Sequence, residues 1–133
     1  MQAIKKVGLF YSVKLLSFFL GLYGCFVLHQ LLEVPIVVSA ASIGLIGSIL
    51  PTTTQFQHHP QAAMYAGAFA GMCSSDVISS PYELVVISLI GAAIYTSLKN
   101  HFIGVGGKLG AIAFVSVASV VLCTMVISKW VIE

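Results

Sequence analysis

The chain has 133 residues, which is enough for one domain, and we treat residues 1–133 as a single helical domain. Hydrophobic residues make up 59% and charged residues 8%, against about 25% charged residues in a typical soluble domain, so most of the surface is expected to face lipid. The net charge of +2 excludes a nucleic-acid-binding footprint.

Residues 9–32 form the first apolar segment, and residues 15–32 alone are long enough to span a bilayer. Lys14 interrupts this segment, and its long side chain is expected to reach the lipid headgroups. We expect the segment to be a membrane helix that also acts as an uncleaved signal anchor. The second segment, residues 34–50, is bounded by Pro35 and Pro51, which suit the first turn and the end of a helix.

Residues 51–60 form a polar connector. Residues 61–80 are small and only moderately apolar, which is compatible with either a thin buried span or a re-entrant half-helix. Residues 81–98 and 109–131 are the fourth and fifth apolar segments, and a basic, glycine-rich linker of residues 99–108 separates them.

The placement of the lysines favours five spans, because positive residues gather on the cytoplasmic side of membrane helices. With five spans Lys5, Lys6, Lys14, Lys99 and Lys108 share one side, and Lys129 lies on the other. We therefore predict an all-α polytopic membrane bundle of about five transmembrane helices, with four spans plus a re-entrant segment as the alternative. The N-terminus is expected to be cytoplasmic, in a bacterial inner membrane.

Small residues recur at helical spacing on two segments. Ala63, Gly67, Gly71 and Ser75 lie on one face of the third segment, and a second stripe on the second segment consists of Ala40, Gly44 and Ser48. Such stripes let helix backbones approach closely in lipid. They predict helix packing within the chain or in a homo-oligomer, and they leave open a narrow, close-packed pathway.

Asp76 is the main candidate for a transport pathway, because acids at membrane depth are costly and usually functional. Ser74 and Ser75 would supply further oxygen ligands, and Glu33 and Glu83 would lie at the outer mouth. The alternative is that Asp76 is a hydrated interfacial acid, or caps the helix that begins near Pro81.

The histidines and cysteines give weaker signals. His29 and Glu33 are four residues apart, as in a proton-sensitive pair or an ordinary interfacial pair. His58 and His59 are expected in a solvated loop and not at a metal site, because no Cys, Asp or Glu lies within reach in the loop. The three cysteines sit in apolar stretches, where we expect them to pack as small apolar side chains.

The sequence contains none of the motifs of nucleophilic, metal-dependent or nucleotide-dependent enzymes, and we predict no enzyme activity, no metal and no cofactor. The expected function is an oligomeric channel or transporter for a cation or small polar solute. The alternative is a non-catalytic accessory or scaffold subunit of a membrane complex. The expected partners are the lipid bilayer and either further copies of the chain or a membrane partner subunit.

Overall fold

The computed structural model describes residues 1–51, 59–73, 77–78, 80–98, 100–101 and 104–132. These residues form five helices and no strand, which confirms the all-α prediction. The helices are α1 (Gln2–Leu32), α2 (Ile36–Ser48), α3 (His59–Ala70), α4 (Pro81–Ser97) and α5 (Lys108–Ile132).

Local signals explain where several helices begin and end. Glu33 closes α1 in the left-handed conformation, with φ of 52°, and Pro35 precedes the first turn of α2. Ser80 caps α4, because its hydroxyl accepts from the amide of Tyr82 at 3.4 Å and the Glu83 carboxylate accepts from the amide of Ser80 at 3.4 Å. α1 starts at Gln2, well before the predicted residue 9, because the lysines near its start do not interrupt the helix.

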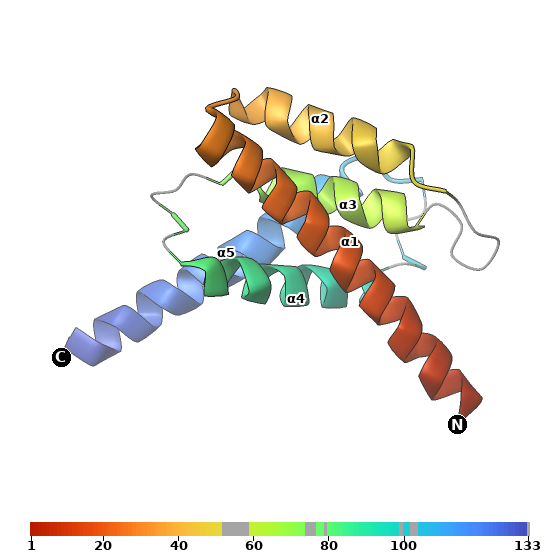
Figure 1. Cartoon of the computed structure of the whole chain (residues 1–133). Helices are drawn as coiled ribbons and strands as arrows, with labels where there is room; N and C mark the ends of the chain where they lie inside the picture. The colour runs from red at the N-terminus through yellow and green to blue at the C-terminus, as the bar shows by residue number, and fades with distance from the viewer. Residues whose placement is uncertain (52–58, 74–76, 79, 99, 102–103, 133) are drawn as a thin grey trace.

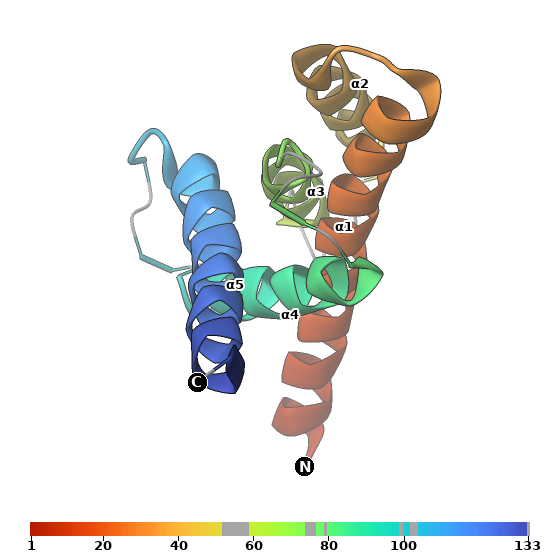
Figure 2. The same ribbon diagram turned by 90° about the vertical axis from the view of Figure 1, so that its left-hand side faces the viewer.

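Successive helices run in alternating directions, and α1 crosses the others diagonally (Figure 1). α3 lies in the middle of the bundle, where it packs against α1, α2, α4 and α5. Figure 2 shows α5 on the side of α3 and α4 away from α2. Residues 2–9 of α1 and residues 122–132 of α5 are exposed on all faces, and these two helix ends extend beyond the bundle (Figure 1).

The closest contact in the fold joins α1 and α3 at glycines. A Cβ atom placed on Gly67 would overlap the backbone carbonyl of Phe18, and one placed on Gly21 would overlap the backbone carbonyl of Met64. Phe18 is fully buried, and its ring fills the space above Gly91 of α4. Two glycines on facing helices and a third beneath a phenylalanine therefore set how closely α1, α3 and α4 approach.

Two helices, α1 with 31 residues and α5 with 25, are long and apolar enough to cross a membrane. α2 has 13 residues, α3 has 12 and α4 has 17, whereas a hydrocarbon core of about 30 Å needs about 20 helical residues. The prediction of five spans is therefore not confirmed. Large apolar side chains are nevertheless exposed on the helices: Leu45 of α2 and Phe114 and Leu122 of α5 are each more than 60% exposed.

Candidate functional site

The side chain of Lys14, on α1, is fully buried. Its ammonium nitrogen lies 4.4 Å from the centre of the Phe10 ring and 4.0 Å from the centre of the Tyr95 ring. A cation this close to an aromatic face is attracted by the negative charge density of the ring. One ring from α1 and one from α4 thus hold the lysine charge inside the bundle.

The prediction that Lys14 reaches the lipid headgroups is wrong. Lys14 follows Lys6 by about 12 Å along the axis of α1, and at that level α4 crosses over the face of α1 that carries it. The aliphatic stem is consequently enclosed by protein, and the ammonium lies against the rings of Phe10 and Tyr95. Lys14 therefore does not belong among the loop lysines that the positive-inside bias compares.

His59, the first residue of α3, joins the same cluster. Its Nδ1 atom lies 3.4 Å from the Tyr95 hydroxyl oxygen, at the outer limit of a hydrogen bond. Its ring stands edge-on to Phe10, with centres 5.8 Å apart, and to Tyr95, with centres 6.3 Å apart. The expectation of a solvated loop is thus wrong for His59, which is half-buried. We call Phe10, Lys14, His59 and Tyr95 the lysine site.

Helical spacing explains why these residues meet. Phe10 and Lys14 are one turn apart on the same face of α1. Lys14 lies one turn before Phe18, and Tyr95 lies one turn after Gly91, the glycine that accommodates the Phe18 ring. The close crossing of α1 and α4 at that glycine therefore brings the Tyr95 ring under the Lys14 ammonium.

Helix ends add to the electrostatics of the site. α3 begins at His59, so the positive end of its dipole lies at the lysine site. α4 ends close to Tyr95, and the Lys108 ammonium donates to the carbonyl oxygens of Leu98 at 2.6 Å and of His101 at 2.9 Å. Lys108 thereby offsets the negative end of α4.

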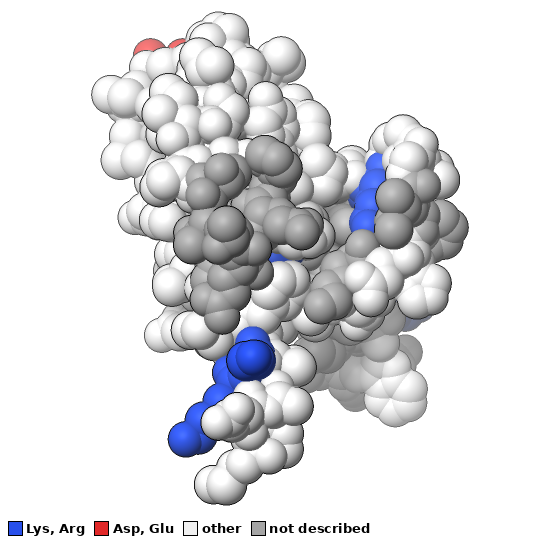
Figure 3. All heavy atoms as spheres, turned by 90° about the vertical axis from the view of Figure 1, so that its right-hand side faces the viewer, with Lys and Arg blue, Asp and Glu red and all other residues white. Residues whose placement is uncertain are grey.

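The acidic residues that the structure describes lie at the opposite end of the bundle. Glu33 is exposed at the end of α1, and Glu83 sits in the first turn of α4. Figure 3 shows the side of the molecule where α3 begins, with blue lysine atoms over its lower and right parts and red carboxylate atoms only at the upper edge. On this face the lysine and carboxylate atoms are therefore separated, whereas Lys129 lies in the last turn of α5.

Glu83 belongs to the cap of α4 through its bond to the Ser80 amide, which gives its carboxylate a structural role. His29 and Glu33 do not form the pair suggested by their spacing. α1 ends at Leu32, Glu33 turns away in the left-handed conformation, and His29 Nδ1 lies 2.9 Å from the carbonyl oxygen of Val34. A pathway role for Glu33 and Glu83 remains a prediction.

Asp76, Ser74 and Ser75, the main pathway candidates, lie outside the described residues, as does His58. Among the residues that are described, no group of three or more His, Cys, Asp or Glu side chains could hold a metal ion. The described candidate sites therefore bring together basic and aromatic groups, and the acidic candidate at Asp76 remains a sequence-based prediction.

The stripe on α3 faces α1 of the same chain. Ala63 is fully buried, Gly67 lies against the backbone of Phe18, and Gly71 lies against Leu22 and Cys25. These residues are occupied by a contact within the chain, so this face of α3 is not available to a second copy. The small residues of α3 consequently do not motivate a homo-oligomer.

Only two of the three small residues of the α2 stripe, Ala40 and Gly44, lie in a helix contact. Ala40 is buried, and Gly44 lies beneath the ring of Tyr65 of α3. Ser48 is exposed, and the neighbouring Gly47 is the residue that lies against Met64. The contact of α2 with α3 thus continues through Gly47 at the end of the helix.

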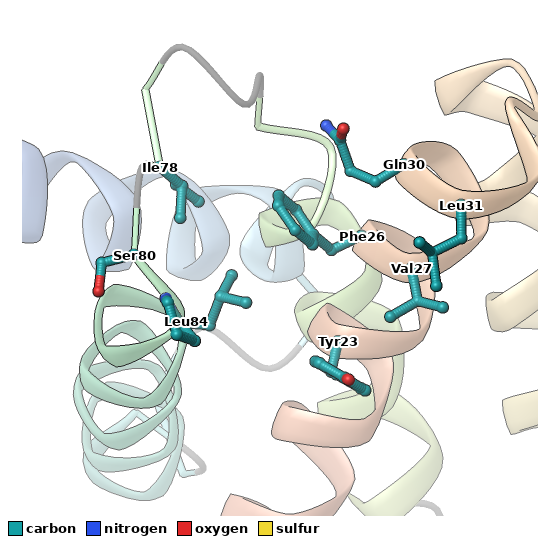
Figure 4. A pocket seen from close by; sticks show the side chains of 9 residues that line it. Tyr23, Phe26, Val27, Gln30, Leu31, Ile78, Ser80 and Leu84 are labelled. Atoms are coloured by element: carbon teal, nitrogen blue, oxygen red, sulfur yellow. The ribbon is translucent and has the colours of Figure 1, made fainter.

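A groove of about 280 Å³ opens between α1 and α4 at the end of the bundle away from the lysine site. Phe26 and Leu84 line it from the two helices, and Gln30 and Ser80 supply polar groups (Figure 4). The groove is mainly apolar and lies beside the start of α4. None of the residues that line the groove is basic, which distinguishes the groove from the lysine site.

Lys14 stands out in the sequence, although its ammonium was expected at the membrane surface, whereas Phe10 and Tyr95 were not predicted to be site residues. The available signal was the ionisable residue within an apolar run, which by itself marks a functional candidate in a membrane helix. Tyr95 could not be linked to it from sequence, since 80 residues separate the two. No protein-family model, no curated protein and no solved structure matches this chain.

Proposed function

We propose that this protein is a small integral membrane transport protein that moves a small polar solute past the lysine site, between α1, α3 and α4. The observation that carries the proposal is the fully buried, ionisable side chain of Lys14 in a bundle that exposes many large apolar side chains. Membrane insertion of a lysine at the centre of a helix costs about 2.5–3.5 kcal/mol, so such residues persist where they serve a function.

The proposal includes the membrane topology. We infer that the five helices cross the bilayer in alternating directions, with the N-terminus in the cytoplasm of a bacterium. Lys5, Lys6 and Lys108 then lie on one side and Lys129 on the other, which agrees with the positive-inside bias. α3, at about 18 Å, is short for a span, but half of its residues are buried by the rest of the bundle and need not meet lipid.

In the described conformation the lysine site is closed, because Lys14 has no exposed surface. Transport therefore requires α1, α3 and α4 to separate at the site. The hydrogen bond between His59 and Tyr95 joins α3 to α4, and the contacts of Lys14 join α1 to α4. These are contacts that opening would break and closure would restore.

The test is a solute panel in liposomes that contain the purified protein. Shrinkage and re-swelling by light scattering report the passage of any small solute, so ions, small organic acids and uncharged solutes can be compared in one assay. The variant is Lys14→Met, which keeps a side chain of similar length, and the control is Lys129→Met on the exposed end of α5. Faster re-swelling for one solute class, lost in Lys14→Met and kept in the control, supports the proposal.

An accessory subunit is the second candidate, favoured by the exposed C-terminal half of α5. Residues 122–132 are all exposed and present Met125 and Trp130 to the surroundings. A membrane partner, or a second copy, could pack along this helix. If no solute passes through liposomes, and polar substitutions at Met125 release a co-purifying membrane protein, the accessory function replaces transport.

A further inference from the structure

We propose that the start of α1 and the end of α4 bind one anionic phospholipid of the cytoplasmic leaflet. Its headgroup is held by Lys5 and Lys6, and one acyl chain lies in an apolar groove between the two helices. This inference rests on the membrane topology of the proposed function, and it does not depend on which solute the protein moves.

The groove has a volume of about 520 Å³ and is open to the surroundings. Its lining consists of one face of the first three turns of α1 and of Thr96 in the last turn of α4; the α1 residues are Ala3, Ile4, Val7, Gly8 and Tyr11. Ile4 is 77% exposed and Val7 is 62% exposed. A Cβ atom placed on Gly8 meets no described atom within 4 Å, so the space beside Gly8 is unfilled.

The length of α1 sets the depth of the groove in the bilayer. With 31 residues, α1 is about 46 Å long, whereas the hydrocarbon core is about 30 Å thick. In the proposed topology the surplus length places the first turns of α1 among the cytoplasmic headgroups. Tyr11, a residue type favoured at this boundary, donates from its hydroxyl to the carbonyl of Leu89 at 3.1 Å and so ties α1 to α4 beside the groove. The groove therefore leads from the headgroups towards the hydrocarbon core, as an acyl chain does.

The charge beside the groove is positive. Lys5 and Lys6 are exposed, and they follow Ile4 and precede Val7 on the same helix. A lysine stem packs along apolar surface while its ammonium reaches the headgroups. Each lysine near an anionic membrane surface strengthens binding about fivefold. The two ammonium groups thus favour an anionic headgroup at the mouth of an apolar groove.

The described acids lie too far away to oppose this attraction. Glu33 follows Lys6 by about 40 Å along α1, and Glu83 precedes Thr96 by about 20 Å along α4. Figure 3 shows lysine atoms and no carboxylate atom on the lower part of the molecule, where α1 begins. The end of α4 carries partial negative charge, which Lys108 offsets by donating to the carbonyl of Leu98. An anionic phospholipid is therefore preferred to a zwitterionic one.

The experiment is photo-crosslinking with phosphatidylglycerol that carries a diazirine in one acyl chain. The full-length protein is reconstituted in phosphatidylcholine vesicles at a low fraction of the probe, where the yield of adducts is proportional to affinity, and mass spectrometry locates the adducts. In the wild type we expect more adducts on residues 3–11 from this probe than from phosphatidylcholine with the same labelled chain. Replacing both Lys5 and Lys6 by Gln should lower that preference by about fivefold for each lysine. Replacing both by Arg should retain the preference, and so should Lys129→Gln in the last turn of α5.

A second variant tests the groove separately from the charge. Gly8→Leu places a side chain in the groove and keeps both lysines, and the open space at Gly8 leaves room for it in the fold. We expect it to lose the adducts on residues 3–11. Ser12→Leu is the matched control, because Ser12 is exposed on the same helix and does not line the groove. It should retain the adducts.

Three outcomes would overturn the lipid site. They are equal yields from the two lipids in the wild type, a preference that persists without Lys5 and Lys6, and a preference that excess soluble glycerol phosphate abolishes, since the ligand would then be a free phosphate ester. The assay needs no movement of solute. A lysine-dependent preference in vesicles without flux therefore leaves transport to fail alone, and flux without the preference leaves the lipid site to fail alone.

Discussion

Replacing Gly67 by alanine is expected to destabilise the bundle strongly for so small a change. The new Cβ atom would overlap the Phe18 carbonyl and lie 3.0 Å from the Leu22 amide nitrogen. Both atoms belong to the backbone of α1, so neither can rotate away, and α1 and α3 must move apart. Overpacking costs about 1–3 kcal/mol, and a contact between two backbones places Gly67→Ala at about 2–3 kcal/mol.

The assay is reversible unfolding of the purified protein in bicelles or mixed micelles, followed by far-UV circular dichroism or by release of a steric trap. Gly8→Ala is the matched control, since Gly8 also lies inside a helix and no atom lies within 4 Å of the added Cβ. We expect that control to stay within about 0.5 kcal/mol of the wild type. If Gly67→Ala proves as stable as Gly8→Ala, the close α1–α3 crossing described here is refuted.

Three further predictions concern the lysine site and the helix ends. Tyr95→Phe keeps the ring over Lys14 but loses the hydroxyl, whereas Tyr95→Leu also removes a cation–π contact of about 0.5–2 kcal/mol. Tyr95→Phe should therefore lower the free energy of unfolding by less than Tyr95→Leu does, as unfolding measurements on both variants would show. Ser80→Ala removes the cap of α4 and should lower the free energy of unfolding by about 0.5–2 kcal/mol, while Ser97→Ala at the other end should have little effect. Lys108→Met removes the ammonium that donates to the carbonyl of Leu98, and should speed amide hydrogen exchange in the last turn of α4 without affecting its first turn.

The helical class could be predicted because four of the five segments are strongly apolar, and each segment is separated from the next by proline, glycine or polar residues. Pro35 and Pro81 lie next to the starts of α2 and α4, as expected from the fixed φ of proline. The start of α3 at His59 was not predicted from the sequence. The polar run of residues 51–60 reads as a connector in isolation, and tertiary contacts with Phe10 and Tyr95 hold its last residues in a helix.

The location of the candidate site could be predicted only in part. Lys14 stands out in the sequence, but its environment depends on how α4 crosses α1, and that crossing depends on Gly91 and the Phe18 ring. Hydropathy alone favoured the nearer membrane surface for its ammonium, because the rest of the segment is long enough to span a bilayer. Long-range pairs such as Lys14 and Tyr95 follow from helix packing, which a single sequence does not specify.

The small-residue stripes also show that residue types could be predicted from the sequence while their contacts could not. Spacing identified the correct residue types for close helix contact on α3, but it could not specify which helix they contact. The backbone of α1 occupies Gly67 and Gly71, whereas the exposed half of α5 carries the large apolar side chains Met125 and Trp130. Any contact with a second copy or a partner subunit is therefore expected along α5, and cross-linking from cysteines placed there would detect it.

The role of Lys14 in transport is tested by the rate of solute-driven re-swelling in liposomes that contain either wild-type protein or Lys14→Met. We expect one solute class to enter wild-type liposomes quickly, and to enter Lys14→Met liposomes no faster than protein-free ones. Lys129→Met should behave as the wild type does. Equal rates for the wild type and a correctly folded Lys14→Met, for every solute that the protein passes, would contradict a role of the buried lysine in transport.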